Sequence, residues 1–214
     1  AQGCKRMLDN GLVDIDELNE PLEKIATQAI RAGEVIRRLR SFIKKSASEL
    51  ELMDANELVS EVVQLAEVDA RKHGIPVHLH LAERLSEVRV DPVQLQQVIL
   101  NLIRNALEAM EETPRERARV DVYTAQEESG QVSIRVVDTG PGLSEDVLKR
   151  VFDPFFTTKS TGMGMGLSIS HSIITAHGGQ LFASNNDSGS GVTFTVILMA
   201  RPARLPDIHN SSMI

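Results

Sequence analysis

Two asparagine side chains have a spacing that could bring their amides together. Asn101 and Asn105 lie four residues apart in the apolar stretch QQVILNLIRNALEAM, so a helix would stack them on one face. Asparagine is a mediocre helix former, and its occurrence twice beside an apolar face requires a reason. Carboxamide oxygens can ligate Mg²⁺, a hard cation that prefers oxygen, and can contact phosphates. The alternative is that both side chains hydrogen-bond neighbouring loops.

A carboxylate and two glycines come at the end of a stretch that alternates like a strand. Asp138 ends that stretch, and the motif DTGPGL places Gly140 and Gly142 directly after it. A carboxylate there can accept a hydrogen bond from an exocyclic amine, while glycines leave room for a flat base. A tight turn after a strand is the competing interpretation of the same residues.

A second glycine cluster, GMGMGL, opens a further helical stretch. It contains Gly162, Gly164 and Gly166, followed by Leu167. At such a helix start, unpaired backbone N–H groups and the positive end of the helix dipole would point at a phosphate. The spacing is GxGxG rather than the dinucleotide GxGxxG, and no GK[ST] follows as in the Walker pattern. By itself the motif is equally compatible with an ordinary loop.

In this order and spacing, the motifs resemble those of the catalytic region of bacterial sensor histidine kinases. That family shares the GHKL ATPase superfamily with Hsp90, gyrase B and MutL. The N box corresponds to NLIRNALEA, the G1 box to DTGPG and the G2 box to GMGMGL. The resemblance covers about residues 54–199. The F box corresponds to Phe152, Pro154, Phe155 and Phe156.

This resemblance implies an ATP–Mg²⁺ site on a Bergerat-type α/β sandwich. Asn105 would be the Mg²⁺ ligand, Asn101 a contact on the phosphate side, and Asp138 the carboxylate that reads adenine. Gly140 and Gly142 would lie against the base.

The resemblance also makes the segment between the two glycine boxes a lid over the nucleotide. Gly162–Leu167 would form the hinge of that lid and the cradle for the phosphates. Phe155, Thr158 and Lys159 are further candidates for contact with the nucleotide. For Lys159, a solvated lid lysine is an equally good interpretation.

One position distinguishes a kinase from its ATP-hydrolysing relatives. In those relatives, the residue four before the metal-ligating Asn is a Glu that activates water. Here it is Asn101, whose amide cannot act as a general base. We therefore expect the γ-phosphoryl to pass to a histidine and then to the receiver domain of a response regulator. The alternatives are a GHL-type ATPase and a non-catalytic nucleotide-binding regulator.

The N-terminal residues predict a helical hairpin. Apolar residues recur at alternating spacings of three and four from Leu22 to Ile43, which describes an a/d seam. A hairpin cannot enclose a core alone, so we expect a homodimer with a four-helix bundle. The stretch DELNEPL resembles the family's phosphoacceptor motif, with Asp16 in place of histidine. Its distance from Asn105 is too short, and we expect the phosphoacceptor upstream of Ala1.

Composition limits the partners and the compartment. The net charge of −7 argues against a nucleic-acid-binding surface, although local dipoles and a metal ion can still hold an anionic nucleotide. A single cysteine, Cys4, fits a reducing compartment, and no long apolar run appears. We therefore expect a cytoplasmic protein, with membrane contact only through a parent protein. His78 and His80 are expected to pack on an edge strand.

Periodicity predicts an α+β fold, a two-layer α/β sandwich preceded by the hairpin. The expected domains are the truncated hairpin at 1–48, the ATP-binding domain at 49–200 and a loose tail at 201–214. A linker is expected at 46–52. Helices are predicted at 54–72, 92–111 and 166–177, and strands at 75–81, 88–90, 118–124, 131–138, 180–184 and 191–198.

Overall fold

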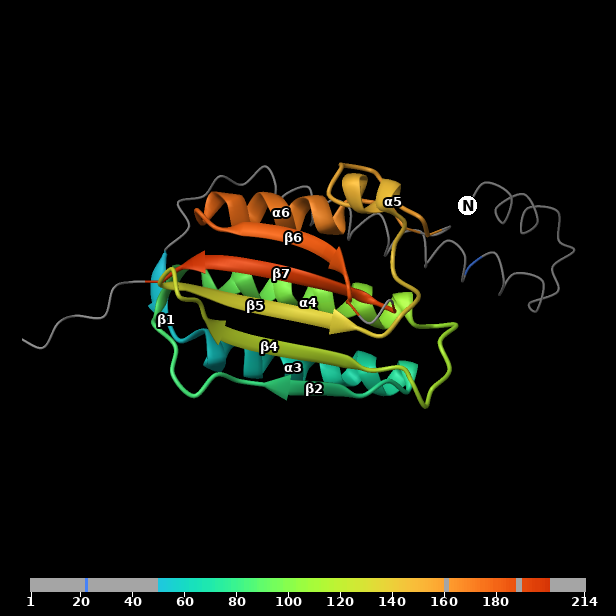
Figure 1. Cartoon of the computed structure of the whole chain (residues 1–214), viewed down its shortest axis with the longest axis horizontal. Helices are drawn as coiled ribbons and strands as arrows, with labels where there is room; N and C mark the ends of the chain where they lie inside the picture. The colour runs from blue at the N-terminus through green and yellow to red at the C-terminus, as the bar shows by residue number, and fades with distance from the viewer. Residues whose placement is uncertain (1–21, 23–49, 160–161, 188–189, 201–214) are drawn as a thin grey trace, which may run out of the picture. The chain divides into compact units, whose positions relative to one another are not determined.

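The computed structural model describes Leu22 and residues 50–159, 162–187 and 190–200 (Figure 1). The chain divides into two compact units, Ala1–Ser48 and Glu49–Ile214. In the first unit only Leu22 is described, and it is helical and 51% exposed. The predicted hairpin, its dimer and the tail at 201–214 therefore lie outside the described residues and stay predictions.

Both ends of one long helix and the start of a second lie at the residues whose chemistry predicted them. Helix α3 spans Ala55–His73, and the Asp54 carboxylate caps it by accepting from a backbone N–H two residues on at 2.7 Å. Gly74 ends α3 in the left-handed region with φ 63°. Helix α4 spans Pro92–Ala109 and is capped by Asp91. Among the described helices, none has the length and hydropathy needed to cross a membrane.

Five strands form one mixed sheet. They are β2 (Val77–His80), β4 (Val120–Gln126), β5 (Gln131–Asp138), β6 (Gln180–Asn185) and β7 (Val192–Met199). Their order is β2-β4-β5-β7-β6, with β2 parallel to β4 and all other neighbours antiparallel. Figure 1 shows α3, α4 and a third helix, α6 (Gly166–Ala176), covering one face of this sheet. This arrangement confirms the predicted two-layer α+β sandwich.

The core lies between the sheet and the helices, and α4 contributes more of its largest fully buried side chains than any other element. Each of these α4 side chains is at most 1% exposed. Burying one such side chain stabilises the fold by about 1.5–3 kcal/mol, so the helix that carries both asparagines is firmly fixed. The buried apolar residues of α4 are Leu95, Val98, Ile99, Leu102, Ile103, Ala106 and Leu107.

Two short elements were not predicted. A three-residue strand, β1 (Glu51–Met53), occupies part of the expected linker and pairs antiparallel with β3 (Val88–Val90). A six-residue helix, α5 (Glu145–Arg150), follows the first glycine motif. Both are too short to show a period of their own. Strand β1 exists because β3 pairs with it, and α5 begins at the Ser144 hydroxyl, which caps it.

A polar cluster lies at the β2 edge of the sheet. His80 stacks on Tyr123 at a ring separation of 4.4 Å, and its Nε2 lies 3.0 Å from the Oδ1 of Asp121. The Arg119 guanidinium donates to the other carboxylate oxygen at 2.8 Å. Burial alone would raise the pKa of Asp121, but the hydrogen bonds from His80 and Arg119 outweigh it and hold the pKa below its ordinary value. His80 therefore packs in the way predicted for an edge strand.

Replacing Asp121 with asparagine should destabilise the protein by about 1–3 kcal/mol at neutral pH, because a buried carboxylate hydrogen-bonded to the Arg119 guanidinium and the His80 ring is lost. Since the folded pKa is lowered, this contribution is present above the unfolded pKa of about 3.9 and is lost as pH falls through the folded value. Urea unfolding of wild type and Asp121→Asn at several pH values measures the difference. The control is Glu128→Gln in the exposed β4–β5 turn. A difference that persists at low pH would contradict the assignment.

Candidate nucleotide-binding site

Asp138 ends β5 with its carboxylate inside the protein. The residue is 2% exposed, and its Oδ1 accepts backbone N–H bonds from Gly140 at 2.9 Å and Val192 at 3.1 Å. Burial raises the pKa of Asp138, and the two backbone hydrogen bonds act in the opposite direction. Within the described part of the chain, both donors use the same oxygen and none is bonded to Oδ2. One oxygen is thus fixed by the backbone, and the other can accept from a ligand.

The β6–β7 turn holds the first glycine loop in place. The Asn186 side chain donates to the Asp138 carbonyl at 2.8 Å and to the Ser190 carbonyl at 2.9 Å. Asn185 accepts from the Leu143 N–H at 2.8 Å and donates to the Leu143 carbonyl at 2.7 Å. Sequence reasoning missed both asparagines, because NNDSGSG indicated only a turn. The doubled asparagine at the end of a strand was the available signal.

Gly191 is a further residue that sequence reasoning missed. Its φ is +91°, and a Cβ there would lie 1.9 Å from the backbone oxygen of Asp138. Gly140 is also closely packed, because its Cβ would lie 3.0 Å from Asp138 Oδ1 and 3.3 Å from Met110 Cγ. Gly142 has φ +80°, which a side chain would strain. These glycines allow two backbone segments to meet around the carboxylate.

Asn101 lies where α4 meets the start of α6. Its Nδ2 donates to the Ser170 hydroxyl at 3.1 Å, and a Cβ on Gly166 would lie 2.7 Å from its Oδ1. The structure therefore brings together an N-box residue and a G2-box residue that are far apart in sequence. It also accounts for the glycine at position 166, because any side chain there would displace the Asn101 amide.

Asn105 lies one turn further along α4 and faces the lid. Its Oδ1 accepts a hydrogen bond from the Lys159 ammonium at 3.3 Å, and the same ammonium contacts Glu108 Oε2. The amide oxygen thus already faces a cation, which is the chemistry that a metal ligand requires. Within the described residues, no three His, Cys, Asp or Glu side chains cluster to hold a metal by themselves. A cation at Asn105 would need phosphate oxygens or water to complete its shell.

The other two glycines of GMGMGL close the base of the lid. A Cβ on Gly162 would lie 2.6 Å from the Thr157 hydroxyl, and one on Gly164 would lie 2.4 Å from both the Phe155 carbonyl carbon and the Phe156 oxygen. Phe155 itself has φ 65° and is 74% exposed, an unusual backbone for a bulky residue. The structure therefore sets Gly164 against the F box, Gly162 against the residues that follow it, and Gly166 against the N box.

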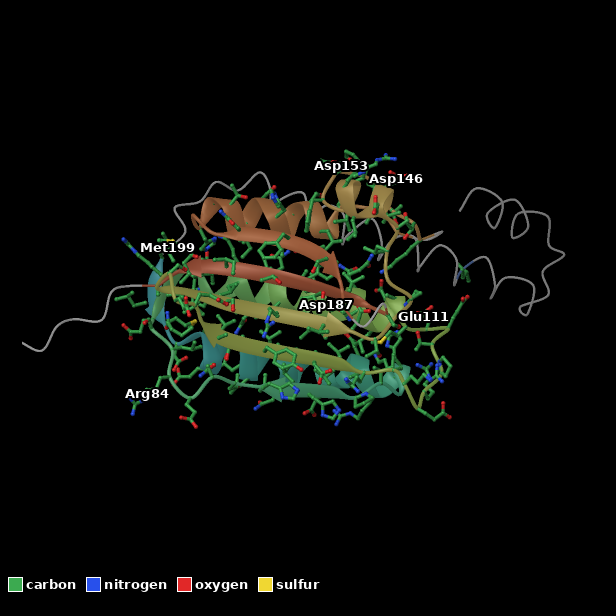
Figure 2. All side chains as sticks on the ribbon, in the orientation of Figure 1. Arg84, Glu111, Asp146, Asp153, Asp187 and Met199 are labelled. Atoms are coloured by element: carbon green, nitrogen blue, oxygen red, sulfur yellow. The ribbon has the colours of Figure 1, made fainter. Side chains whose placement is uncertain are left out.

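The remaining lid candidates occupy different environments. Thr158 and Lys159 are exposed, whereas Leu167 is partly buried and packs against the hydrophobic core. Leu167 thus serves the packing of α6 in this structure. The lid continues from α5, where Figure 2 labels the exposed carboxylates of Asp146 and Asp153.

The last turn of α4 connects the base side and the phosphate side of the candidate site. Met110 caps α4, and its side chain lies against Gly140 beside Asp138. Asn105 precedes Met110 by five residues, a rise of about 7.5 Å along a helix. The Asn105 amide therefore lies at one end of this segment, and the Asp138 carboxylate lies near Met110 at the other end.

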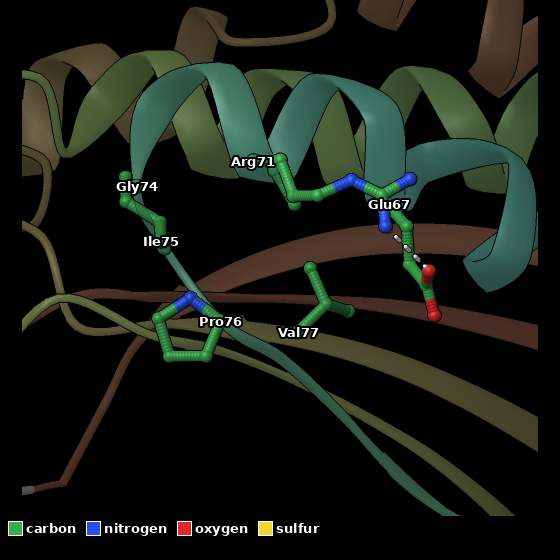
Figure 3. Close-up of a pocket in the computed structure, with 7 residues that line it drawn as sticks. Glu67, Arg71, Gly74, Ile75, Pro76 and Val77 are labelled. Carbon is green, nitrogen blue, oxygen red and sulfur yellow. Dashed lines mark hydrogen bonds and ion pairs between the residues drawn. The ribbon is translucent and has the colours of Figure 1, made fainter.

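A separate cavity of about 350 Å³ lies between the end of α3 and the start of β2. Figure 3 shows Arg71 paired with Glu67 beside Pro76 and Val77. Its lining contains none of the candidate residues, and the Arg71–Glu67 pair is 3.5 Å long and exposed. This cavity is therefore separate from the candidate site described above.

Comparison with known proteins decides the family. The family described as "Histidine kinase-, DNA gyrase B-, and HSP90-like ATPase" matches residues 90–202, more than half of the chain. The chain belongs to this family. The matched stretch contains every candidate residue from Asn101 to Leu167.

Relatives of this ATPase-family chain are sensor kinases. Sensor protein FixL of Bradyrhizobium diazoefficiens is 42% identical over 200 residues, covering 93% of this chain and 39% of FixL. The catalytic domain of histidine kinase ThkA is 32% identical with a TM-score of 0.62, covering 71% of this chain and 96% of that domain. ThkA in complex with response regulator protein TrrA gives 26% identity and a TM-score of 0.74, covering 95% of this chain and 57% of ThkA. The ATP-binding domain of the present chain is thus of the sensor histidine kinase type. The chain spans well under half the length of FixL.

Proposed function

We propose that this chain is the catalytic region of a sensor histidine kinase in a two-component system. It binds ATP–Mg²⁺ and transfers the γ-phosphoryl to a hairpin histidine. The phosphoryl group then passes to the receiver domain of a response regulator. The family match and the sensor-kinase relatives support this proposal. The complex of ThkA with TrrA supports a response regulator as partner. The predicted apolar seam at 22–43 supports a homodimer.

The observation that carries the proposal is the placement of two polar groups around the C-terminal end of α4: Asn105 on the helix, and the β5 residue Asp138 beside Met110, which caps it. The buried Asp138 carboxylate can accept from the exocyclic amine of adenine through Oδ2, because Oδ1 is fixed by two backbone N–H groups. The Asn105 amide oxygen faces a cation on the side where the phosphates would lie. A nucleotide bound between them has its base and its phosphates recognised by separate groups.

In the proposed mechanism, the chain positions the reactants and balances their charge. Mg²⁺, when bound, neutralises the phosphate oxygens, and Asn105 is the residue that would hold it. Asn101 keeps its amide at the start of α6 through Ser170. The N–H groups at that helix start can then donate to phosphate oxygens. The lid residues exclude water from the γ-phosphoryl.

The Asn101 amide also argues against the ATPase alternative. An amide has no basic lone pair to take a proton from water. Here the amide nitrogen of Asn101 also donates a hydrogen bond to the Ser170 hydroxyl. We expect steady-state hydrolysis to be slow and to stay slow in Asn101→Ala. A hydrolysis rate abolished by that substitution would favour a GHL-type ATPase. Retained ATP binding without any phosphohistidine would favour a non-catalytic regulator.

Asn105→Ala should weaken ATP binding in Mg²⁺ by about tenfold, ~1.4 kcal/mol, because the protein's metal ligand is lost. In EDTA the variant and wild type should bind equally. Calorimetric titration with a non-hydrolysable ATP analogue measures both conditions, and Gln97→Ala on an exposed position of α4 is the matched control. A tenfold loss that persists in EDTA would place Asn105 on the nucleotide rather than on the metal.

The transfer step requires a protein that carries the phosphoacceptor hairpin together with this domain. With γ-labelled ATP, such a protein should acquire acid-labile, base-stable phosphate. Asn105→Ala should slow this labelling, whereas Gln97→Ala should leave it unchanged. Labelling that is stable to acid would contradict a histidine acceptor.

A further inference from the structure

Lys159, Asn105 and Glu108 form a three-residue contact between the lid and α4. The Lys159 ammonium donates to Asn105 Oδ1 at 3.3 Å and contacts the Glu108 carboxylate. Asn105 and Glu108 are three residues apart on α4 and therefore share one face. Lys159 lies more than fifty residues away in sequence. The contact thus joins the lid to the residue proposed as metal ligand.

We propose that Lys159 is a latch that occupies the cation position in the nucleotide-free protein, is anchored there by Glu108, and must be displaced when the metal binds. This inference rests on the proposed function, because it takes Asn105 as the Mg²⁺ ligand. It adds a competition between a lid side chain and the metal for one amide oxygen. Release of the Lys159 side chain and metal binding are then a single coupled event.

Geometry makes the two cations exclude each other. A Mg²⁺ ligand lies about 2.0–2.1 Å from the metal. The Lys159 ammonium lies 3.3 Å from the same oxygen. Two positive groups on one amide oxygen would repel each other at close range, and the ammonium already occupies a lone pair of that oxygen. Lys159 must therefore leave before Asn105 can ligate the metal.

Glu108 makes the latch specific but weak. Its carboxylate gives Lys159 a charge-assisted partner that Asn105 alone cannot supply. The two side chains are 38% and 45% exposed, so solvent screens the pair. Exposed ion pairs of this kind contribute little, and the closed state is favoured only a few-fold over the open one. A latch of this strength tunes affinity without preventing binding.

The base of the lid directs where Lys159 can move. Gly162 packs against Thr157 and against the Lys159 Cβ, at 2.6 and 3.2 Å from a Cβ placed on that glycine. Gly164 packs against the Phe155–Phe156 peptide. The described backbone at 155–159 is thus closely packed, and the Lys159 side chain can swing while that backbone stays in place. Once released from Glu108, the ammonium can approach a phosphate.

Glu108→Gln tests the latch, with Glu112→Gln as a control that removes the same charge just beyond α4. The first measurement is affinity for a non-hydrolysable ATP analogue in saturating Mg²⁺. Glu108→Gln should bind about 2–5-fold more tightly than wild type, and Glu112→Gln should match wild type. Weaker binding in Glu108→Gln would show that Glu108 supports the metal, and unchanged binding would show that no latch operates. Either result overturns the proposal.

A second measurement needs no ligand. In the nucleotide-free protein, the ¹H–¹⁵N signals of the Asn105 carboxamide should shift in both Lys159→Met and Glu108→Gln, and not in Glu112→Gln. An Asn105 carboxamide signal whose chemical shift is unchanged in Lys159→Met would contradict the latch proposal. Failure of the proposed function looks different, because wild type would then bind the analogue with no dependence on Mg²⁺.

Discussion

Asp138→Asn is expected to bind ATP about 100-fold more weakly than wild type, ~3 kcal/mol, while the fold becomes more stable. The asparagine oxygen can still accept from the Gly140 and Val192 N–H groups, so the loop is kept. Its NH₂ group then replaces Oδ2 and faces the exocyclic amine of adenine. Both groups are hydrogen-bond donors, so the bond to adenine is lost. Calorimetric titration with an ATP analogue checks the affinity. An unchanged affinity would refute the adenine assignment.

The direction of the stability change in Asp138→Asn follows from the pKa of the carboxyl group. Burial raises the folded pKa of Asp138, so its contribution to stability is present below the unfolded pKa and is lost as pH rises through the folded value. As pH rises through the folded pKa, the carboxylate ionises and destabilises the fold, and Asp138→Asn should then raise Tm. The difference should shrink below about pH 4, where wild type is also neutral. Asp121→Asn is the matched contrast, because its effect on Tm has the opposite sign.

Gly191→Ala is expected to destabilise the protein by about 3 kcal/mol or more and to abolish measurable ATP binding. The added Cβ would lie 1.9 Å from the backbone oxygen of Asp138, and backbone cannot move aside as a flexible side chain can. The clash separates the β6–β7 turn from the carboxylate. Urea unfolding and nucleotide titration measure the two effects.

Gly130→Ala separates the clash from the cost of a positive φ. Gly130 has φ +76° in the β4–β5 turn, with no atom within 4 Å of a Cβ placed there. It should lose only about 1 kcal/mol, the cost of the left-handed backbone, and should bind ATP normally. Equal destabilisation by the two alanines would show that backbone conformation alone explains the Gly191 effect.

The parts of the fold that could be predicted have local causes. Asp54, Gly74 and Asp91 each act within a few residues, so the ends of α3 and the start of α4 followed from the sequence. The apolar face of α4 repeats with the helical period and identified the core. Strand β1 could not be predicted in this way, because it depends on pairing with Val88–Val90 more than thirty residues on.

The candidate site shows the same division. The asparagine spacing on α4 and the glycines after β5 are local, and they pointed to the two ends of the site. Asn186 and Gly191 contact Asp138 from about fifty residues away in the sequence. The composition of the β6–β7 turn predicts a turn, but not which residue the turn contacts. The contact of Lys159 with Glu108 is equally distant. Such pairings follow from the strand order and the lid path, which the sequence pattern leaves open.

The strand order has a consequence for synthesis of the chain. β7 lies between β5 and β6, although among the described strands it is the last to be made. Asp138 therefore gains its Val192 donor only after the β6–β7 hairpin has left the ribosome and β7 has paired with β5. A nascent chain that ends before Asn186 contains every N-box and G2-box residue, yet its base pocket is unfinished. The Asp138 carboxylate thus gains its full set of backbone donors only once β7 has paired with β5.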